Sequence, residues 1–305
     1  MATPRPDLKD EIARLKREKD ALILVHNYQI AEVQEVADSI GDSLDLARKA
    51  VEARKNLIVF CGVRFMAETA KILNPSAKVL LPREDAGCPM ADMVTSEDVR
   101  ELRHRYPDAA VCSYVNTNAD VKAETDICCT SANAVGVVQS LGSKQVIFTP
   151  DRNLAAYVAG QVSNEIIPPT GYCYVHQRFS REDISQAKLA HPQAVVMVHP
   201  ECVLEVIGVA DKVLSTSGML KFARESSARE FIVATEEGLL ERMSRELPGK
   251  RFYSPGKARY CFNMKKTRLE DVLHSLDQEV YEIKLDPEIM RLARKPLERM
   301  IRPGP

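Results

Sequence analysis

Three cysteine residues lie at matching positions of a threefold internal repeat. Cys88 lies in the sequence G-C-P-M, Cys173 in G-Y-C-Y-V-H and Cys261 in R-Y-C-F-N-M. Cys173 follows Cys88 by 85 residues, and Cys261 follows Cys173 by 88 residues. A structural zinc site normally has four protein ligands, often in close pairs. Three distant cysteines without an obvious fourth ligand therefore predict a metal site with an open coordination position, to which each repeat supplies one thiolate.

The spacing leaves two kinds of metal open. Three thiolates can hold a catalytic zinc ion. A cubane iron–sulfur cluster is wider, suits ligands from three separate domains and leaves one iron free for a substrate, so the spacing favours the cluster. Cys202 lies at a strand end where it could line a cavity, but no other repeat has a matching cysteine. The remaining cysteines lie in apolar segments and are expected to be core residues: Cys61, Cys112, Cys128 and Cys129.

The same register relates further polar residues. Second-copy residues follow their first-copy equivalents by 88 positions, and third-copy residues follow them by 173 positions. The carboxyl ends of parallel strands form the ligand-binding edge of a sheet, so these side chains are expected to line one cavity. In repeat order they are His26, Tyr28 and Ser43; Tyr114, Asn116 and Ser131; and His199, Glu201 and Thr216.

The hydroxyls of this set have two possible roles. Ser43, Ser131 and Thr216 each lie in a short polar loop before an expected helix. Such residues commonly cap helices. A helix N-terminus also attracts anions, and three of them facing one cavity would form a binding floor for carboxylate or phosphate groups. The sequence leaves both roles open.

The strand-end residues of the set predict acid–base chemistry. His26 and His199 occupy matching strand ends, which favours substrate contact over a buried structural role. Glu201 is the single carboxylate among the equivalent first-strand residues, which makes it the candidate general base.

Short apolar segments alternate with helical patterns throughout the chain. The expected strands are 21–25, 57–61 and 79–81 in the first copy; 111–115, 127–129, 146–148 and 165–167 in the second; and 194–198, 212–214, 231–233 and 251–253 in the third. In the first copy, a polar loop at 26–28 leads into a helical stretch that ends near residue 53. Apolar strands separated by helices indicate a parallel sheet that is covered on both faces.

The fold class is therefore α/β. We predict three homologous three-layer α/β/α domains with short parallel sheets, arranged with pseudo-threefold symmetry around a central active site. The expected domains are residues 1–88, 89–173 and 174–261. The tail, 262–305, contains helical patterns at 269–276 and 287–301 and is expected to pack back on the first domain.

Composition narrows the class of protein. The chain has 305 residues, 45% hydrophobic content and a formal net charge of −1, which suits a globular protein and argues against a nucleic-acid binder. We find no apolar run of membrane-spanning length, and the first 20 residues are charged rather than signal-like. We expect a cytoplasmic protein, without a membrane or nucleic-acid partner, whose cysteines are free thiols or metal ligands.

Several motifs together resemble the quinolinate synthase family. They are H-N-Y-Q at 26–29, G-D-S-L at 41–44, Y-V-N at 114–116, D-I-C-C-T-S-A-N-A at 126–134, V-H-Q at 175–177, H-P-E-C at 199–202 and N-M-K-K at 263–266. The resemblance runs from about residue 22 to the C-terminus. Each motif is weak alone, but the combination is highly specific.

This resemblance implies a fold, a cofactor and a reaction. Three α/β domains would surround one 4Fe-4S cluster per chain, held by Cys88, Cys173 and Cys261. The implied reaction condenses iminoaspartate with dihydroxyacetone phosphate to give quinolinate, phosphate and water for NAD biosynthesis. A functional link to an iminoaspartate-producing enzyme is also implied.

The resemblance also assigns roles to residues. Glu201, Tyr28 and His199 are the implied catalytic residues, with Tyr28 as a proton shuttle. The open iron would act as a non-redox Lewis acid. The implied substrate-binding residues are His26, Ser43, Tyr114, Asn116, Ser131, His176, His199, Glu201, Ser215 and Thr216.

Three alternatives share part of this plan. An isoprenoid-pathway reductase that removes a hydroxyl group and a diphthamide-forming radical enzyme also combine three domains with three cysteines. Neither is expected to carry H-N-Y-Q together with H-P-E-C. An iron–sulfur sensor without enzymatic activity would not need the polar cavity, and the chain lacks the basic patch that DNA binding requires.

Overall fold

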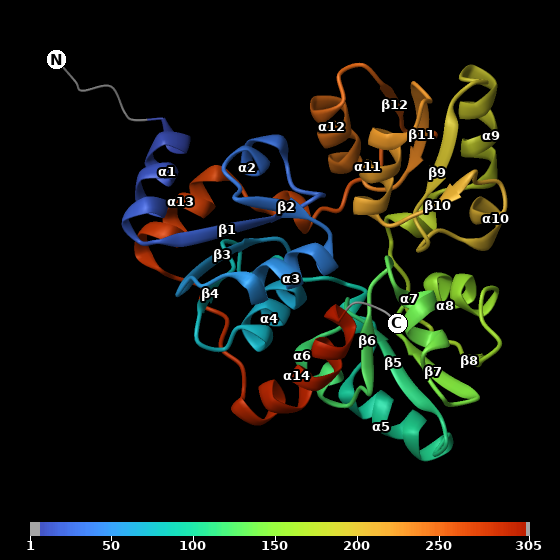
Figure 1. The fold of residues 1–305 in the computed structure, drawn as a ribbon, viewed down its shortest axis with the longest axis horizontal. Coiled ribbons are helices and arrows are strands. Elements are labelled where there is room, and N and C mark those ends of the chain that lie inside the picture. Colours follow the sequence, from blue (N-terminus) through green and yellow to red (C-terminus); the bar gives the residue numbers. More distant parts are fainter. Residues whose placement is uncertain (1–6, 303–305) are drawn as a thin grey trace.

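The computed structural model describes residues 7–302, which form three four-stranded sheets in which all strand pairs are parallel. The strand orders are β2-β1-β3-β4, β6-β5-β7-β8 and β10-β9-β11-β12, so each sheet repeats the same topology. Figure 1 shows three separate units, with the first (blue to cyan) beside the third (yellow to orange) and the second (green) below them. The predicted α/β fold class is confirmed.

The strands lie close to the predicted segments. In the first sheet they are β1 (Ala21–His26), β2 (Ser39–Gly41), β3 (Leu57–Cys61) and β4 (Lys78–Leu80). In the second they are β5 (Ala110–Tyr114), β6 (Ile127–Cys129), β7 (Gln145–Thr149) and β8 (Glu165–Ile167). In the third they are β9 (Val195–Val198), β10 (Lys212–Val213), β11 (Glu230–Ala234) and β12 (Arg251–Tyr253).

Helices cover both faces of the sheets. The first unit contains α1 (Leu8–Glu18), α2 (Ala31–Glu35), α3 (Ser43–Glu52) and α4 (Arg64–Leu73). The second contains α5 (Ser96–Arg105), α6 (Ala119–Ala123), α7 (Ala134–Gln139) and α8 (Arg152–Ala159). The third contains α9 (Arg181–Ala190), α10 (Leu204–Ile207), α11 (Thr216–Glu225) and α12 (Glu237–Glu246), and the tail contains α13 (Leu269–Gln278) and α14 (Pro287–Ile301).

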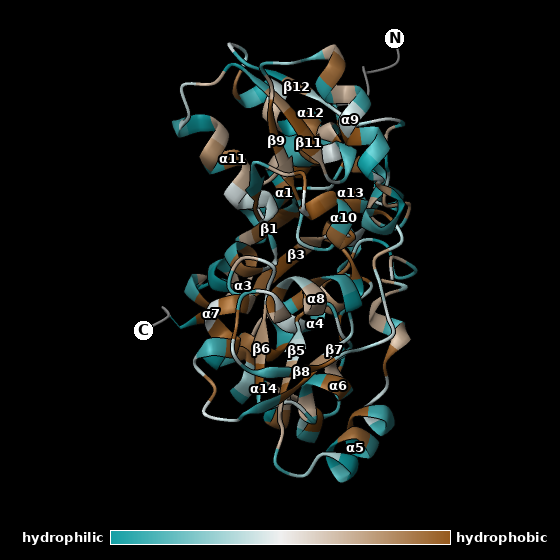
Figure 2. Ribbon diagram, turned by 90° about the vertical axis from the view of Figure 1, so that its right-hand side faces the viewer, coloured by the Kyte–Doolittle hydropathy of each residue, from teal (hydrophilic) through white to brown (hydrophobic). Residues whose placement is uncertain are grey.

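Alternate residues of β1 enter two different cores. Leu24 packs into a core with α3 and α4, whereas Ile23 and Val25 pack on the opposite face with α1 and α13. Successive strand side chains point to opposite faces, so a strand that is apolar throughout must be covered on both sides. The hydropathy colouring of Figure 2 shows this pattern, with hydrophobic strands enclosed by helices that carry hydrophilic segments.

One element was not predicted from the sequence. The stretch between Tyr28 and Ala53 was expected to be a loop and a single helical segment, but it consists of α2, the short edge strand β2, and α3. Asp38 accepts a hydrogen bond from the backbone N–H of Ile23 at 2.8 Å and so joins the segment to β1. Asp42 then starts α3 by accepting hydrogen bonds from the backbone N–H groups of Leu44 and Asp45. These local hydrogen bonds interrupt the helix.

The two tail helices lie in different places. The helix α13 packs against α1 of the first unit. The helix α14 packs against α6 and β6 of the second unit as well as α4 of the first, so the tail contacts both units. The domain boundaries at residues 88, 173 and 261 remain predictions; each interval contains one sheet.

Candidate active site

One cavity collects residues from all three units. Of the candidate residues, Ser215 alone is not part of the lining. The candidates that line the cavity are His26, Tyr28, Ser43, Cys88, Tyr114, Asn116, Ser131, Cys173, His176, His199, Glu201, Thr216 and Cys261.

The strand ends bring these residues together. His26 is the last residue of β1, Tyr114 is the last residue of β5, and His199 directly follows β9. Another lining residue follows each of them two positions later: Tyr28, Asn116 and Glu201, respectively. Because the equivalent strand of each parallel sheet ends at the cavity, the repeat delivers equivalent side chains from three units.

The three repeat cysteines lie in matching turns. A short 3-10 helix begins three residues after each cysteine: Ala91–Met93, His176–Arg178 and Met264–Lys266. Cys88, Cys173 and Cys261 are only partly buried and line the cavity. By contrast, Cys61, Cys112, Cys128 and Cys129 are fully buried within β3, β5 and β6, and Cys202 is buried away from the lining. The cysteines that were expected to be core residues are core residues.

The surroundings of these thiols suit a metal-bound form. Burial is the main cause that raises the pKa of Cys88 to about 12, and it raises the pKa of Cys173 and Cys261 as well. A thiol with a raised pKa stays protonated at neutral pH unless a cation compensates the charge of the thiolate.

A chain of hydrogen-bonding groups connects Glu201 to Tyr28. The Nδ1 atom of His176 lies 2.6 Å from Oε2 of Glu201, and its Nε2 atom lies 2.9 Å from Oγ1 of Thr235. The Thr235 hydroxyl lies 2.7 Å from the Tyr28 hydroxyl. One consistent direction has Tyr28 donating to Thr235, Thr235 to His176, and His176 to the Glu201 carboxylate.

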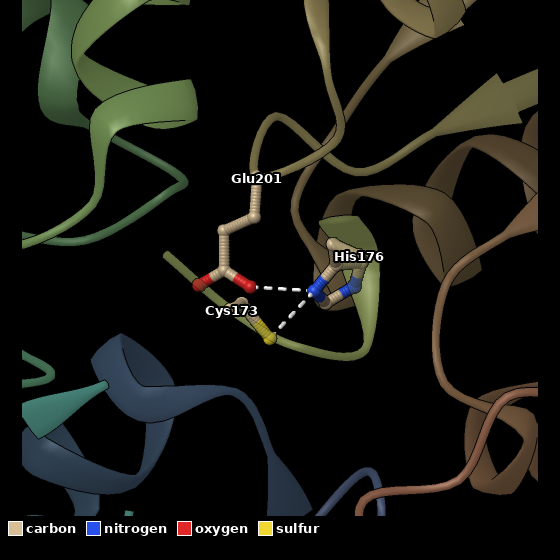
Figure 3. A group of neighbouring side chains, drawn as sticks. All are labelled: Cys173, His176 and Glu201. Atoms are coloured by element: carbon tan, nitrogen blue, oxygen red, sulfur yellow. Dashed lines mark hydrogen bonds and ion pairs between the residues drawn. The ribbon is translucent and has the colours of Figure 1, made fainter. Parts of the chain in front are cut away.

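A compact group of ligand-type atoms lies at one end of this chain. The ligand atoms of Cys173, His176 and Glu201 lie within 4.8 Å of one another, and Figure 3 shows the His176 ring between the Cys173 sulfur and the Glu201 carboxylate. The Nδ1 atom of His176 is 3.2 Å from the Cys173 sulfur. Thiol, imidazole and carboxylate groups are all common metal ligands.

Burial controls the charge state of the acid–base residues. Burial, together with the nearby charge of Lys265, lowers the pKa of His26 to about 3. Burial and the neighbouring His176 lower the pKa of His199 to about 3. Burial raises the pKa of Glu201, but His176, His199 and a hydrogen bond from Tyr114 outweigh burial and hold this pKa at about 2. At neutral pH the cavity therefore contains a Glu201 carboxylate and neutral His26 and His199 imidazoles.

Ser43 and Thr216 do not cap the helices that they begin. Asp42 is the N-cap of α3, which leaves Ser43 at the first helical position. Ser215 is the N-cap of α11 and accepts a hydrogen bond from the backbone N–H of Gly218, which leaves Thr216 at the first helical position. The N-cap position of α7 belongs to Asn133, and Ser131 precedes it in the turn. Capping does not account for these three cavity hydroxyls.

Sequence reasoning missed several residues of the site. Asp42 lines the cavity, and burial raises its pKa. Thr235 contacts both Tyr28 and His176. For Asp42 a signal was present, because it lies inside the G-D-S-L motif and precedes the candidate Ser215 by the repeat offset of 173 residues. For Thr235 the repeat register contained no signal. The missed apolar part of the lining is Val63, Phe65, Met66, Met90, Val175 and Met264.

A comparison with known families decides the relationship of this chain. The family model described as quinolinate synthetase A protein matches residues 10–302. The chain belongs to the quinolinate synthetase A protein family. The match to this enzyme family does not support the reductase, radical-enzyme or sensor alternatives.

Curated relatives of the quinolinate synthetase A family match almost the whole chain. The quinolinate synthase of Methanoregula boonei is 52% identical over 294 residues, which cover 96% of this chain and 97% of the relative. The quinolinate synthase of Alkaliphilus metalliredigens is 50% identical over 96% of this chain and 97% of its own length. Quinolinate synthase 2 of Methanosarcina acetivorans is 48% identical over 96% of this chain and 95% of its own length.

The helices of this family member do not resemble membrane spans. Between residues 7 and 302, none of them is both long enough and apolar enough to cross a bilayer.

Proposed function

We propose that this protein makes quinolinate by condensing iminoaspartate with dihydroxyacetone phosphate, which releases phosphate and water, as a step of NAD biosynthesis. The observation that carries the proposal is the single cavity in which three domains bring together three cysteines, a buried Glu201 carboxylate and a set of hydroxyl and imidazole groups. Relatives that are about half identical over their full length carry the name quinolinate synthase.

The proposed cofactor is one 4Fe-4S cluster per chain, bound by Cys88, Cys173 and Cys261. A single tetrahedral ion with a metal–sulfur distance of about 2.3 Å would hold three sulfur atoms about 3.8 Å apart. Among residues 7–302, the group of ligand atoms that lie within 4.8 Å of one another includes one of these cysteines, Cys173, but neither Cys88 nor Cys261. This wider spacing supports a cluster rather than a single zinc ion.

The neighbours of the cysteines fit such a group. The cysteine loops come from three units, and the apolar side chains Phe65, Met66 and Met264 line the same cavity. When bound, the cluster would supply Lewis acidity that makes water a better leaving group.

The chain itself supplies the acid–base groups. Glu201 is ionised and buried, so its carboxylate is available to remove a proton from carbon. Burial raises the pKa of Tyr28 well above its usual value, so Tyr28 keeps its proton and donates a hydrogen bond. The contacts through Thr235 and His176 give a proton a path between Tyr28 and Glu201.

The anionic parts of the substrates need donors. Iminoaspartate carries two carboxylates and dihydroxyacetone phosphate carries a phosphate. Ser43, Ser131 and Thr216 come from the three units and precede or begin helices, where backbone N–H groups also favour anions. Neutral His26 and His199 donate hydrogen bonds without adding bulky cations. We assign substrate binding to these residues together with Tyr114, Asn116 and His176.

The proposed partner is an enzyme that produces iminoaspartate, because the imine hydrolyses readily in water and needs a nearby source. The proposed location is the cytoplasm, since none of the eight cysteines, all of which lie within residues 7–302, forms a disulfide bond, as expected in a reducing compartment.

Anaerobic purification followed by an assay for quinolinate tests the function. The expected result is about four irons and four sulfides per chain and quinolinate formation from the two substrates. Glu201→Gln should keep the iron but lose about 10²- to 10⁴-fold in kcat, the usual contribution of a general base. Stoichiometric zinc without iron would contradict the cofactor. An iron-loaded protein that forms no quinolinate would contradict the reaction.

A further inference from the structure

A buried amide lies directly behind one of the cavity hydroxyls. Asn27 follows β1 in the first unit and is completely buried. Its Nδ2 atom lies 2.7 Å from Oγ1 of Thr216, the first residue of α11 in the third unit. Its Oδ1 atom accepts a hydrogen bond from Nη1 of Arg242 in α12. Asn27 is therefore held between two elements of the neighbouring unit.

Arg242 fixes the orientation of this amide. The oxygen and nitrogen of an asparagine side chain can exchange places unless their partners distinguish them. A guanidinium group has only donors, so the atom of Asn27 that faces Arg242 must be the oxygen. The NH₂ group then faces Thr216. An ion pair between Nε of Arg242 and Oε1 of Glu246, at 2.6 Å, holds the guanidinium in place.

This orientation determines what the Thr216 hydroxyl does. The Asn27 NH₂ group can only donate, so Oγ1 of Thr216 must accept. Within residues 7–302, Asn27 is the hydrogen-bonding partner found for this hydroxyl. The hydroxyl proton of Thr216 is then free, and the side chain is buried and lines the cavity. A ligand in the cavity meets Thr216 as a hydrogen-bond donor.

We propose that Asn27 is a positioning residue that commits the Thr216 hydroxyl to donating a hydrogen bond to an anionic oxygen of the substrate, either a carboxylate or a phosphate oxygen. This inference rests on the proposed function. Ser43 and Ser131 line the same cavity, but within residues 7–302 neither of them has a buried amide partner like the one that Asn27 provides for Thr216. Their hydroxyls can rotate to suit donor or acceptor groups, whereas Thr216 selects for an acceptor.

A double-mutant cycle in the metal-loaded protein under anaerobic conditions tests the proposal. Asn27→Asp keeps the shape but replaces the donor with an acceptor, so the Thr216 hydroxyl turns toward it. We expect Asn27→Asp and Thr216→Val each to raise the KM for dihydroxyacetone phosphate or the Kd for quinolinate by about tenfold or more, the size of a charge-assisted hydrogen bond. The double variant should lose no more than either single variant, because Asn27 acts through Thr216.

The choice of ligand separates the two sources of the anionic oxygen. Quinolinate carries two carboxylates and no phosphate, so an effect on its Kd alone indicates a carboxylate. An effect on the KM for dihydroxyacetone phosphate alone indicates the phosphate. The matched control is Arg245→Met, which removes another polar contact between the first and third units, to Gln34, and neither residue is part of the cavity lining. This control should leave both constants unchanged.

A second variant keeps the test decisive if Asn27→Asp does not fold. Arg242→Met removes the group that orients the amide, and its effect on ligand affinity should disappear in the Thr216→Val background. An effect that persists there would come from the lost charge and would overturn the proposal, as would additive losses in the cycle. If the wild-type protein makes no quinolinate, the proposed function fails, but calorimetry with malonate and inorganic phosphate still compares wild type with Asn27→Asp.

Discussion

The first unit meets its two neighbours through interfaces of opposite character. Toward the second unit it shares one continuous hydrophobic core, to which both units and the tail helix α14 contribute. The hydrogen bond from the backbone N–H of Ala119 to Glu68 is a polar contact within that interface. Toward the third unit, the contacts are mainly side-chain hydrogen bonds: Asn27 with Thr216 and Arg242, Asp42 with Ser215, Gln34 with Arg245, and Asp45 with Ser217.

The two interfaces contribute differently to the organisation of the cavity. Apolar packing is not directional, so the hydrophobic core shared by the first and second units fixes positions but does not orient hydrogen-bonding groups. Hydrogen bonds are directional, so the first–third interface determines which groups donate and which accept. Thr216 and Tyr28 both gain their orientation from contacts between the first and third units. The polar interface therefore prepares hydrogen-bonding groups, and the apolar interface provides a fixed base.

Loss of the metal should have the largest effect, because it should reveal the difference in strength between the first–second and first–third interfaces. Cys88→Ser, Cys173→Ser and Cys261→Ser are each expected to abolish iron retention and activity, because each unit supplies one thiolate. Without this cross-link the third unit is held by polar contacts, so it should unfold before the other two. Calorimetry should show one transition for the metal-loaded protein and two for Cys261→Ser, and hydrogen exchange should assign the first to residues 181–253.

Cys61→Ser serves as the control for metal loss. Its side chain is buried in β3 away from the cavity, so it should lower stability but retain the iron. A single transition in iron-free Cys261→Ser would contradict the proposed weakness of the first–third interface.

The apolar interface should depend on α14. Leu297 is completely buried in the core that the first and second units share. Leu297→Ala should lower the free energy of unfolding by about 2–5 kcal/mol, because it leaves a cavity in that core. Leu292 on the same helix is 40% exposed, so Leu292→Ala is the matched control and should have little effect. Equal destabilisation by both variants, measured by anaerobic denaturation, would show that α14 does not seal the interface.

The repeat register made much of the cavity predictable. Parallel strands with the same topology end at the same edge, so one offset relates His26 to His199 and Cys88 to Cys261 without any knowledge of the packing. The short strand β2 was missed because its sequence, Ser-Ile-Gly, has one apolar residue, whereas the equally short β6, Ile-Cys-Cys, is apolar throughout. The contact of α14 with the second unit was not predicted, because an amphipathic pattern shows that one face of a helix is buried but does not identify the element that buries it.

The polar interface was beyond sequence reasoning for a different reason. Asn27 and Arg242 are 215 residues apart, and neither has a repeat partner in the candidate set. Asp42 and Ser215 perform the capping that the sequence equally allowed for Ser43 and Thr216. A shift of one residue at a helix start decides whether a hydroxyl caps the helix or faces the cavity, and side-chain chemistry alone allows both.

The cationic character of the first–third interface should appear in the pH dependence of stability. Burial, Lys265 and Arg242 lower the pKa of His26 to about 3 from its usual value of about 6.5. Below pH 6.5 the unfolded chain takes up a proton that folded His26 does not. Stability should therefore fall as the pH decreases from about 6.5 toward 3, by up to about 1.4 kcal/mol per pH unit for this group.

A variant isolates the contribution of His26. His26→Asn should make the fall in melting temperature between pH 7 and pH 5 less steep under anaerobic conditions. His104 is exposed at the end of α5, so His104→Asn is the control and should leave the slope unchanged. Identical slopes for wild type and His26→Asn would show that His26 gains no proton on unfolding.

The smallest expected effect on stability concerns the hydroxyls on the apolar side of the comparison. Ser43 and Ser131 belong to the two units that share the hydrophobic core, and Asp42 already caps α3 while Asn133 holds the N-cap position of α7. Loss of a helix cap costs about 1 kcal/mol. Because neither serine is a cap, Ser43→Ala and Ser131→Ala should change the free energy of unfolding by less than about 0.5 kcal/mol, as expected for substitutions outside any structural feature.

The same variants should weaken quinolinate binding, since both serines line the cavity. The control is Ser140→Ala, which removes an exposed hydroxyl at the end of α7, outside the cavity lining, and should change neither quantity. Melting temperature and quinolinate affinity, measured together, decide the outcome: a lowered melting temperature with unchanged affinity would return both serines to a structural role and would leave Thr216, held by the polar interface, as the one hydroxyl of the three that is committed to the ligand.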